Sequence, residues 1–311
     1  MSKKILISGL NGFCGSNLAL HELKRGNTVI GIVRDKNAKT RPEIQEKCTI
    51  IRGDICDFDL VKRVISDYEI DLIYHVAAQS IVKIANKNPM NCYHSNILGT
   101  INIMEAVRQV NPKIKIVCAS SDKAYGTHDK LPYTEDMKLQ PDDPYSTSKA
   151  CADMIAQSYH KTYGLDVNVI RCANIYGVGD MNLSRIIPNT IRQIKQGKQP
   201  QLYAGVVNYK REFIYIDDVC EAYQIIAQKG IKGEIYNIGD TEFFTIGDLV
   251  NKIGALMNYG GVYEIIGKDF IEIPFQYLSA EKLQGLGWRK KTSIDEGLKK
   301  TIEWYDSNLL F

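Results

Sequence analysis

The chain has 311 residues, of which 44% are hydrophobic and 24% charged, and these values are typical of a globular protein with one large domain or two smaller ones. Its 39 basic and 36 acidic residues leave a net charge of only +3, spread along the chain, so we expect binding neither to nucleic acid nor to a membrane surface. No apolar run approaches the roughly 20 residues of a membrane span, and the first residues do not resemble a signal peptide.

Short apolar strands alternate with helices through the first half of the chain. Strands are expected at residues 4–8, 28–33, 48–52, 72–75, 114–119 and 166–171. Helices are expected at about 16–25, 58–67, 94–109 and 144–163. Because strands that alternate with helices on short connections form parallel sheets, we predict an α/β fold with a doubly wound parallel Rossmann sheet.

The pattern is less regular after residue 176. Helices are expected at about 183–196, 217–228, 245–258 and 293–305, and strands near 201, near 212 and at 234–238. Asp217 is expected to cap the second of these helices. Because these elements cannot all extend one sheet, we expect a second, smaller α/β lobe over the carboxyl edge of the first.

Three glycines follow the first strand and open the first helix. They have the spacing Gly9-x-x-Gly12-x-x-Gly15. Glycines let a backbone turn tightly and approach a pyrophosphate at a helix N-terminus, so this motif indicates dinucleotide binding. The alternative is a glycine-rich turn without a ligand.

Ionisable and hydroxyl groups crowd together directly after the strand at 114–119, in Ser120-Ser121-Asp122-Lys123. The stretch lies at the carboxyl end of a strand, where open α/β sheets place their ligands. A Tyr-x-x-x-Lys pair, Tyr145 and Lys149, follows on the next helix. Positions i and i+4 share a helix face, so the ammonium should lie near the phenol and lower its pKa.

Together these motifs resemble the extended short-chain dehydrogenases of the sugar-nucleotide epimerase/dehydratase group. The resemblance runs nearly from end to end. It is also carried by Gly53-Asp54, His75-Val-Ala-Ala-Gln79, Asn96-x-x-Gly99-Thr100, Arg171-x-x-Asn174-x-Tyr176-Gly177, Arg211-Glu-Phe-Ile-Tyr-Ile-Asp217-Asp218, Tyr236-Asn-Ile-Gly239 and Leu286-Gly-Trp288.

The resemblance implies a set of site residues. Those that would hold the cofactor are Gly9, Asn11, Gly12, Phe13, Gly15, Arg34, Asp54, Ile55, Ala77, Ala78, Gln79, Asn96, Tyr145 and Lys149. Those that would bind the substrate are Gln79, Ser80, Asn174, Arg185 and Arg211. In the alternative interpretation Asp54 only caps a turn and Arg211 is a surface charge.

The residues after Ser121 separate the subfamilies. Epimerases of this group need only the hydroxyl with the Tyr/Lys pair, whereas 4,6-dehydratases add an acid and a base in the next two positions. Asp122-Lys123 resembles the variant of CDP-glucose 4,6-dehydratases, and so does the segment 183–188. The strand end Gly31-Ile-Val-Arg34 is more similar to GDP-mannose 4,6-dehydratases, which leaves the nucleotide open.

The resulting hypothesis is a nucleotide-sugar 4,6-dehydratase. Tyr145, aided by Ser121, would take the proton of the sugar 4-hydroxyl while hydride leaves C4 for the nicotinamide. The 4-ketone acidifies the C5 proton, a base removes it, and Asp122 protonates the departing 6-hydroxyl. Hydride then returns to C6 and a proton from solvent is added at C5, which gives the 4-keto-6-deoxy product. Asp122 must stay protonated, so burial should raise its pKa, and Lys123 either is the base or positions the substrate.

The cofactor form depends on the end of the second strand. An acidic residue there usually binds the ribose 2′-hydroxyl of NAD. Arg34 with Lys36 or Lys39 would meet a 2′-phosphate, while Asp35 would meet a hydroxyl. We therefore favour NADP, with NAD possible.

We assign residues 1–178 plus about 211–250 to the dinucleotide-binding Rossmann domain, and about 179–210 plus 251–311 to the sugar-nucleotide-binding lobe. The enzyme alternatives are a 4-epimerase or 4-reductase, and the non-enzyme alternative is a cofactor-sensing regulator. The resemblance implies a homodimer through the helices near 94–109 and 145–163. The eight cysteines form neither a Cys-x-x-Cys pair nor a zinc pattern, so a reduced, cytoplasmic protein without a metal is expected.

Overall fold

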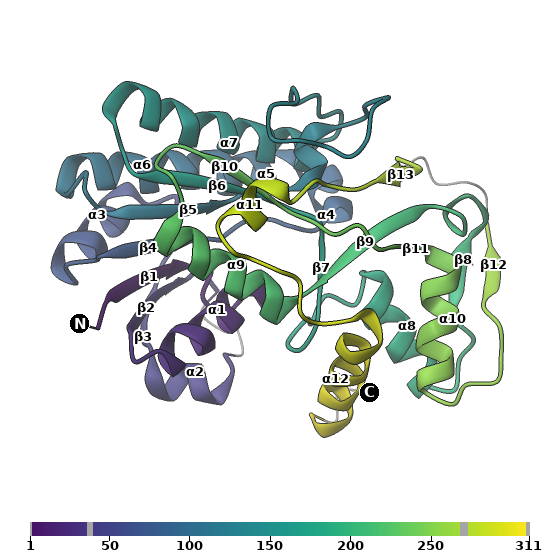
Figure 1. The fold of residues 1–311 in the computed structure, drawn as a ribbon. Helices are drawn as coiled ribbons and strands as arrows, with labels where there is room; N and C mark the ends of the chain where they lie inside the picture. Colours follow the sequence, from purple (N-terminus) through teal and green to yellow (C-terminus); the bar gives the residue numbers. More distant parts are fainter. Residues whose placement is uncertain (1, 36–39, 268–272, 309–311) are drawn as a thin grey trace.

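The main sheet of the computed structural model has seven parallel strands in the order β10-β6-β5-β4-β1-β2-β3 (Figure 1). The structure describes residues 2–35, 40–267 and 273–308. The strands are β1 (Lys4–Ser8), β2 (Thr28–Val33), β3 (Thr49–Arg52), β4 (Leu72–His75), β5 (Lys115–Ala119), β6 (Val167–Cys172) and β10 (Ile235–Ile238). The strand order reverses between β1 and β4, as in a doubly wound Rossmann sheet, so the predicted fold class is confirmed.

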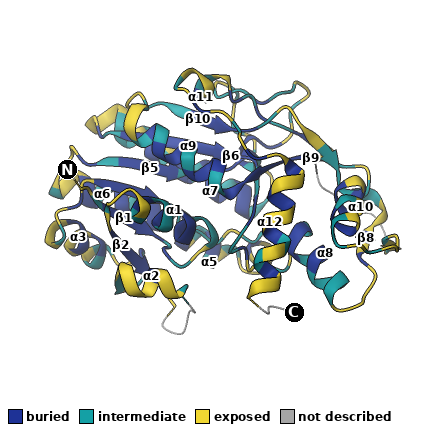
Figure 2. Ribbon diagram, turned by 60° about the horizontal axis from the view of Figure 1, so that its bottom comes forward, coloured by how far each residue is buried: buried dark blue, intermediate teal, exposed yellow. Residues whose placement is uncertain are grey.

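Helices cover both faces of this sheet because its strands are apolar on both sides (Figures 1 and 2). In β1, Leu6 points toward one core cluster, whereas Ile5 and Ile7 point toward the other. The first cluster is covered by α3 (Phe58–Asp67), α6 (Gly99–Val110) and α7 (Pro144–Tyr163). The second is covered by α1 (Phe13–Lys24) and α9 (Ile216–Lys229).

Several short or irregular elements differ from the prediction. The helix expected at 94–109 begins as a π-helical turn, His94–Leu98, before α6. Short helices that were not predicted are α2 (Pro42–Lys47), α4 (Val82–Lys87), α5 (Pro89–Tyr93) and α11 (Glu281–Gly285). The predicted cap at Asp217 is wrong: Tyr215 holds the N-cap position, and the Asp217 carboxylate instead pairs with His21 at 3.0 Å.

A second lobe extends from the carboxyl end of the main sheet (Figure 1). Its four-stranded sheet contains β7 (Asn174–Tyr176), β9 (Lys210–Tyr215), β11 (Phe243–Thr245) and β13 (Phe275–Gln276). The remaining elements are α8 (Ile186–Lys195), β8 (Gln201–Tyr203), α10 (Ile246–Leu256), β12 (Glu264–Ile266) and α12 (Ile294–Ser307). This smaller α/β lobe was expected. The predicted domain boundaries, with about 211–250 in the Rossmann domain, stay a prediction. Within that range β9 and β11 pair in the second sheet, while β10 joins the main sheet.

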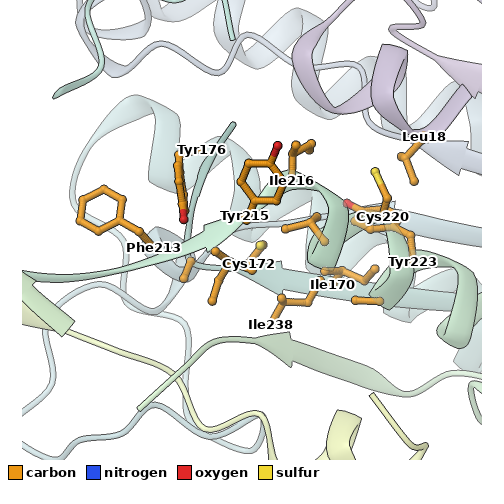
Figure 3. Close-up of a cluster of buried hydrophobic side chains, with 14 of the residues drawn as sticks. Leu18, Ile170, Cys172, Tyr176, Phe213, Tyr215, Ile216, Cys220, Tyr223 and Ile238 are labelled. Atoms are coloured by element: carbon orange, nitrogen blue, oxygen red, sulfur yellow. The ribbon is translucent and has the colours of Figure 1, made fainter. Parts of the chain in front are cut away.

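One continuous core joins the two parts (Figure 3). Ile170 and Ile238 come from neighbouring strands of the main sheet, Tyr223 comes from α9, and Phe213 and Tyr215 come from β9 of the second sheet. This shared core therefore fixes the position of the second lobe relative to the main sheet. Within the described ranges, no helix is both long and apolar enough to cross a membrane.

Candidate active site

The stretch after β5 folds into a 3₁₀ turn, Asp122–Tyr125. Ser121 caps this turn, because its Oγ accepts a hydrogen bond from the Lys123 backbone N–H at 3.2 Å. The same hydroxyl donates to Asp122 Oδ1 at 3.0 Å. Ser121 and Asp122 are buried and Lys123 is half-buried. The cap thus holds the hydroxyl and the carboxyl side by side.

Helix α7 brings Tyr145 and Lys149 to the same place. Asp143 starts the helix by accepting hydrogen bonds from the backbone N–H groups of Tyr145 and Ser146, at 2.9 and 3.1 Å. The Lys149 ammonium donates to the Ala119 carbonyl, the last of β5, at 2.8 Å. The structure therefore brings together the predicted groups Ser121, Tyr145 and Lys149.

Burial controls the electrostatics of this pair. It raises the pKa of Tyr145 to about 12, and a hydrogen bond with Ser121 and the charge of Arg185 oppose this only in part. Burial likewise lowers the pKa of the Lys149 ammonium. The expectation that Lys149 would leave the phenol with a lowered pKa is wrong for the free protein, because the loss of solvation outweighs the hydrogen bond with Ser121 and the charge of Arg185.

Asp122 shows the pKa direction that a general acid requires. Burial raises its pKa, while the charge of Lys123, the hydrogen bond from Ser121 and the charge of Arg211 lower it less. The expected direction is confirmed. Whether Lys123 is the base or positions the substrate stays a prediction.

The glycine-rich loop is shaped by close backbone approaches. Gly9 has φ +72°, and a Cβ there would lie 2.9 Å from Ala77 Cα. A Cβ on Gly15 would lie 2.2 Å from the Gly9 carbonyl oxygen. Gly12 is the N-cap of α1, which has no side-chain cap within the described part of the chain. The loop and the free N–H groups of α1 fit a pyrophosphate.

The other predicted cofactor residues lie along the same edge of the sheet. Asp54 Oδ1 accepts from the Cys56 N–H at 3.0 Å, as the turn-capping alternative predicted. Ile55 packs under α6, and Ala77, Ala78 and Gln79 are half-buried after β4. Arg34 is exposed and donates to Ser95 Oγ at 3.1 Å. Lys36 and Lys39 lie outside the described residues.

Asn96 braces the site. Its Oδ1 accepts from the Gln79 N–H at 2.7 Å, and its Nδ2 donates to Ser148 Oγ at 2.8 Å. The side chain thus ties the segment after β4 to α7. Any cofactor contact of Asn96 stays a prediction.

Sequence reasoning missed a buried network at the switch between β1 and β4. Ser8 Oγ accepts from two backbone N–H groups, one of them that of Ala77, so its proton is directed to His75 Nδ1 at 2.8 Å. The Nε2–H of His75 then donates to Thr100 Oγ1 at 2.9 Å, and Thr100 donates to the Asn96 carbonyl. Burial lowers the pKa of His75 to about 3, so the ring is a neutral structural bridge.

A second missed network anchors the 3₁₀ turn. The Tyr125 hydroxyl donates to Asn237 Oδ1 at 2.8 Å, and the Arg171 guanidinium lies 4.7 Å from the centroid of the Tyr125 ring. Arg171 in turn forms a buried ion pair with Asp153 of α7 at 2.8 Å. Arg171 belonged to a recognised motif, but its spacing gave no signal for this role. The network fixes the orientation of the turn that carries Asp122.

A cleft lies between the glycine-rich loop and the segment after β7. Its lining residues are Asn11, Gly12, Phe13, Ser80, Ile81, Gly179, Asp180, Met181, Asn182 and Arg185. Arg185 pairs with Asp180 at 3.0 Å and lies over the Phe13 ring at 5.6 Å. The predicted substrate residues Ser80 and Arg185 therefore face the predicted cofactor loop.

Arg211 and Asn174 lie on the adjacent strands β9 and β7. Arg211 is buried and donates to the carbonyls of Ile273 at 2.5 Å and Pro274 at 3.3 Å, so the surface-charge alternative is wrong. The Asn174 amide donates to the Glu212 carbonyl at 3.3 Å. This face gives the second lobe a positive charge near Asp122.

Known proteins resemble this chain along its whole length. A family model described as GDP-mannose 4,6 dehydratase matches residues 6–301. A trifunctional UDP-glucose 4,6-dehydratase/UDP-4-keto-6-deoxy-D-glucose 3,5-epimerase/UDP-4-keto-L-rhamnose-reductase of Arabidopsis thaliana is 31% identical over 323 residues. That match covers 98% of this chain but 48% of the plant protein, so the chain spans about half the length of this relative.

Solved structures have the same fold. The dTDP-glucose 4,6-dehydratase of Bacillus anthracis in complex with NAD has a TM-score of 0.90 at 30% identity, with 100% of this chain and 98% of that one covered. The UDP-glucose 4-epimerase of Thermotoga maritima with UDP-glucose has a TM-score of 0.92 at 26% identity, with 98% and 99% covered. Given the family match over residues 6–301, this chain belongs to the GDP-mannose 4,6 dehydratase family of the extended short-chain dehydrogenases.

Proposed function

We propose that this protein converts an NDP-hexose to its 4-keto-6-deoxy product, as a nucleotide-sugar 4,6-dehydratase. The observation that carries the proposal is Asp122, a buried carboxyl group with a raised pKa that is hydrogen-bonded to Ser121. An acid of this kind is required to release the 6-hydroxyl as water. A 4-epimerase has no use for it, because its reaction breaks no C–O bond.

Each buried group has a role in moving a proton. Tyr145 accepts the proton of the sugar 4-hydroxyl through Ser121, and Asp122 delivers a proton to the departing 6-hydroxyl. Because Tyr145 is a neutral phenol in the free protein, its phenolate has to be stabilised in the complex. The hydrogen bond with Ser121 and the charge of Arg185 both act in that direction. Lys123 acts at C5, as the base or by positioning the ring.

The dinucleotide is held by the glycine-rich loop, Gly9 to Gly15, and by Ala77 to Gln79. When bound, the nicotinamide supplies the oxidation at C4 and the later reduction at C6. We keep NADP as the favoured form, because the exposed Arg34 directly follows β2. Mass spectrometry of the cofactor released from purified protein tests this: NADP with weaker binding in Arg34→Ala is expected, and NAD with unchanged binding would contradict it.

The protein is further proposed to form a homodimer through α6 and α7. Support comes from apolar side chains that protrude on this side: Met154 and Tyr163 of α7 are 53% and 54% exposed, and Met90 of the adjacent α5 is 76% exposed. A monomer of this kind would leave an apolar surface in water.

Substitution of the acid tests the reaction class. Asp122→Asn should keep C4 oxidation, seen as transient reduction of the cofactor, and lower the rate of water loss by roughly 10²–10⁴-fold. Tyr145→Phe is the matched control and should abolish both steps. An unchanged dehydration rate in Asp122→Asn would contradict the proposal and favour a 4-epimerase or 4-reductase.

A further inference from the structure

Gln276 of β13 is a buried polar side chain that the reaction has not used. It is 1% exposed, and neither Nε2 nor Oε1 of its carboxamide has a hydrogen-bond partner in the described part of the chain. Buried carboxamides are almost always paired, so we expect Gln276 to have a partner other than the residues that the structure describes.

The strand register places this carboxamide beside Arg211 and Asn174, two of the predicted substrate-binding residues. β13 runs parallel to β9, with Gln276 opposite Arg211, and side chains of opposed residues point to the same face of a sheet. Asn174 of β7 is opposite Phe213, which lies on this face as well, two residues after Arg211. One face of the second sheet therefore presents a guanidinium between two carboxamides.

The chemistry of a carboxamide restricts what it can bind. Phosphate oxygens only accept hydrogen bonds, so a phosphate would leave Gln276 Oε1 unpaired. A sugar hydroxyl, or the edge of a nucleobase, offers a donor and an acceptor together and satisfies both atoms. Arg211, in contrast, suits the phosphates themselves. The two side chains thus fit adjoining parts of one nucleotide sugar.

We propose that Gln276 is a substrate-binding residue whose carboxamide pairs with a donor–acceptor group of the nucleotide sugar, next to the diphosphate at Arg211. The inference rests on the proposed substrate class but not on the dehydration chemistry. A polar group without a partner is kept in the free protein at a cost to stability, because it is satisfied only when the substrate is bound. Gln276 is therefore a determinant of specificity, while Arg211 supplies the charge.

Binding to Gln276→Met tests the proposal, because methionine has a similar shape and makes no such hydrogen bonds. Titration calorimetry would use whichever of UDP-glucose, dTDP-glucose, CDP-glucose and GDP-mannose the wild type binds. We expect a Kd about tenfold higher or more, together with a higher Tm of the free protein. Gln224→Met, on α9 away from this sheet, is the control and should keep the wild-type Kd. Gln276→Glu, which loses the donor, should also weaken binding.

The corresponding nucleoside diphosphate identifies the bound group. Weaker binding of both the diphosphate and the nucleotide sugar places the group in the nucleoside, whereas weaker binding of the nucleotide sugar alone places it in the hexose. Kd values within about twofold of wild type for both variants would overturn the inference and leave water as the partner of Gln276. A wild type that binds none of the four compounds would overturn the proposed function as well.

Discussion

Burial displaces the pKa of Asp122, Tyr145 and Lys149 toward the uncharged form of each side chain. Asp122 thereby retains the proton that it has to donate, which suits its role in the free protein. Tyr145 has to lose its proton, which the free protein disfavours. The two groups therefore have opposite requirements. Substrate binding has to lower the pKa of the Tyr145 phenol while the Asp122 carboxyl group stays protonated.

The raised pKa of Asp122 has a consequence for stability. A carboxyl group whose pKa is higher in the folded protein stabilises the fold at low pH, and this contribution is lost as pH rises through the raised pKa. Asp122→Asn cannot ionise, so it should be more stable than wild type at neutral pH. Its free energy of unfolding should be higher by about 1.4 kcal/mol for each unit by which the pKa of Asp122 is raised. Below the ordinary value of 3.8 the gain should vanish.

Thermal unfolding of both proteins across pH measures this difference. Asp136→Asn is the control, because the Asp136 carboxylate is at the surface and its pKa is lowered by a hydrogen bond with Thr134. A stability difference between wild type and Asp122→Asn that does not change with pH would contradict the direction of the shift.

Local spacing made part of the site predictable. Tyr145 and Lys149 share a helix face, and Ser121 follows a buried strand, so sequence sufficed to place them together. The partners of Tyr125 and Gln276 could not be predicted, since Asn237 lies 112 residues after Tyr125 and Arg211 lies on another strand. Burial also reversed the expected pKa of Tyr145, because sequence spacing shows the nearby cation and not the missing water.

At the level of elements, the main strands were predictable because most of them are short, largely apolar runs whose residues are buried on both faces of the sheet. The small strands were not. β7, β11 and β13 have only two or three residues, and each exists because it pairs with β9. The π-helical turn His94–Leu98 interrupts an otherwise regular helical pattern, so periodicity alone extended α6 too far.

The close backbone packing of the glycine-rich loop predicts the effect of a substitution at Gly15, in the first turn of α1. Gly15→Ala places a Cβ against the Gly9 carbonyl, so the backbone has to shift. We expect a loss of about 1–3 kcal/mol in the free energy of unfolding and weaker binding of the dinucleotide. Gly285→Ala in α11 is the control, because a Cβ there meets no described atom within 4 Å. Unchanged dinucleotide affinity in Gly15→Ala, measured by calorimetry, would contradict the assignment of the loop.

For the whole molecule, the hydrophobic core in Figure 3 determines how the two lobes are joined. Because Phe213 and Tyr215 of β9 belong to the same hydrophobic core as α9 and the main sheet, this core joins the second lobe to the main sheet. This arrangement holds the acid of one lobe and the cations of the other at a constant separation.

The proposed dimer is also a property of the whole molecule. Met154→Glu places a charge on the exposed face of α7 and should convert the dimer to a monomer, measured by light scattering coupled to size exclusion. Ile231→Glu is the control, since Ile231 is 63% exposed between α9 and β10 and should leave the dimer intact. A monomeric wild type would contradict the proposal.

The central claim is loss of water from a nucleotide sugar, and incubation with GDP-, CDP-, UDP- and dTDP-hexoses in deuterium oxide measures it most directly. The proposed dehydratase should release, from at least one of them, a product lighter by one water that carries solvent deuterium at C5. A product that is only an isomer of its substrate, with no deuterium at C5, would contradict the account and identify an epimerase.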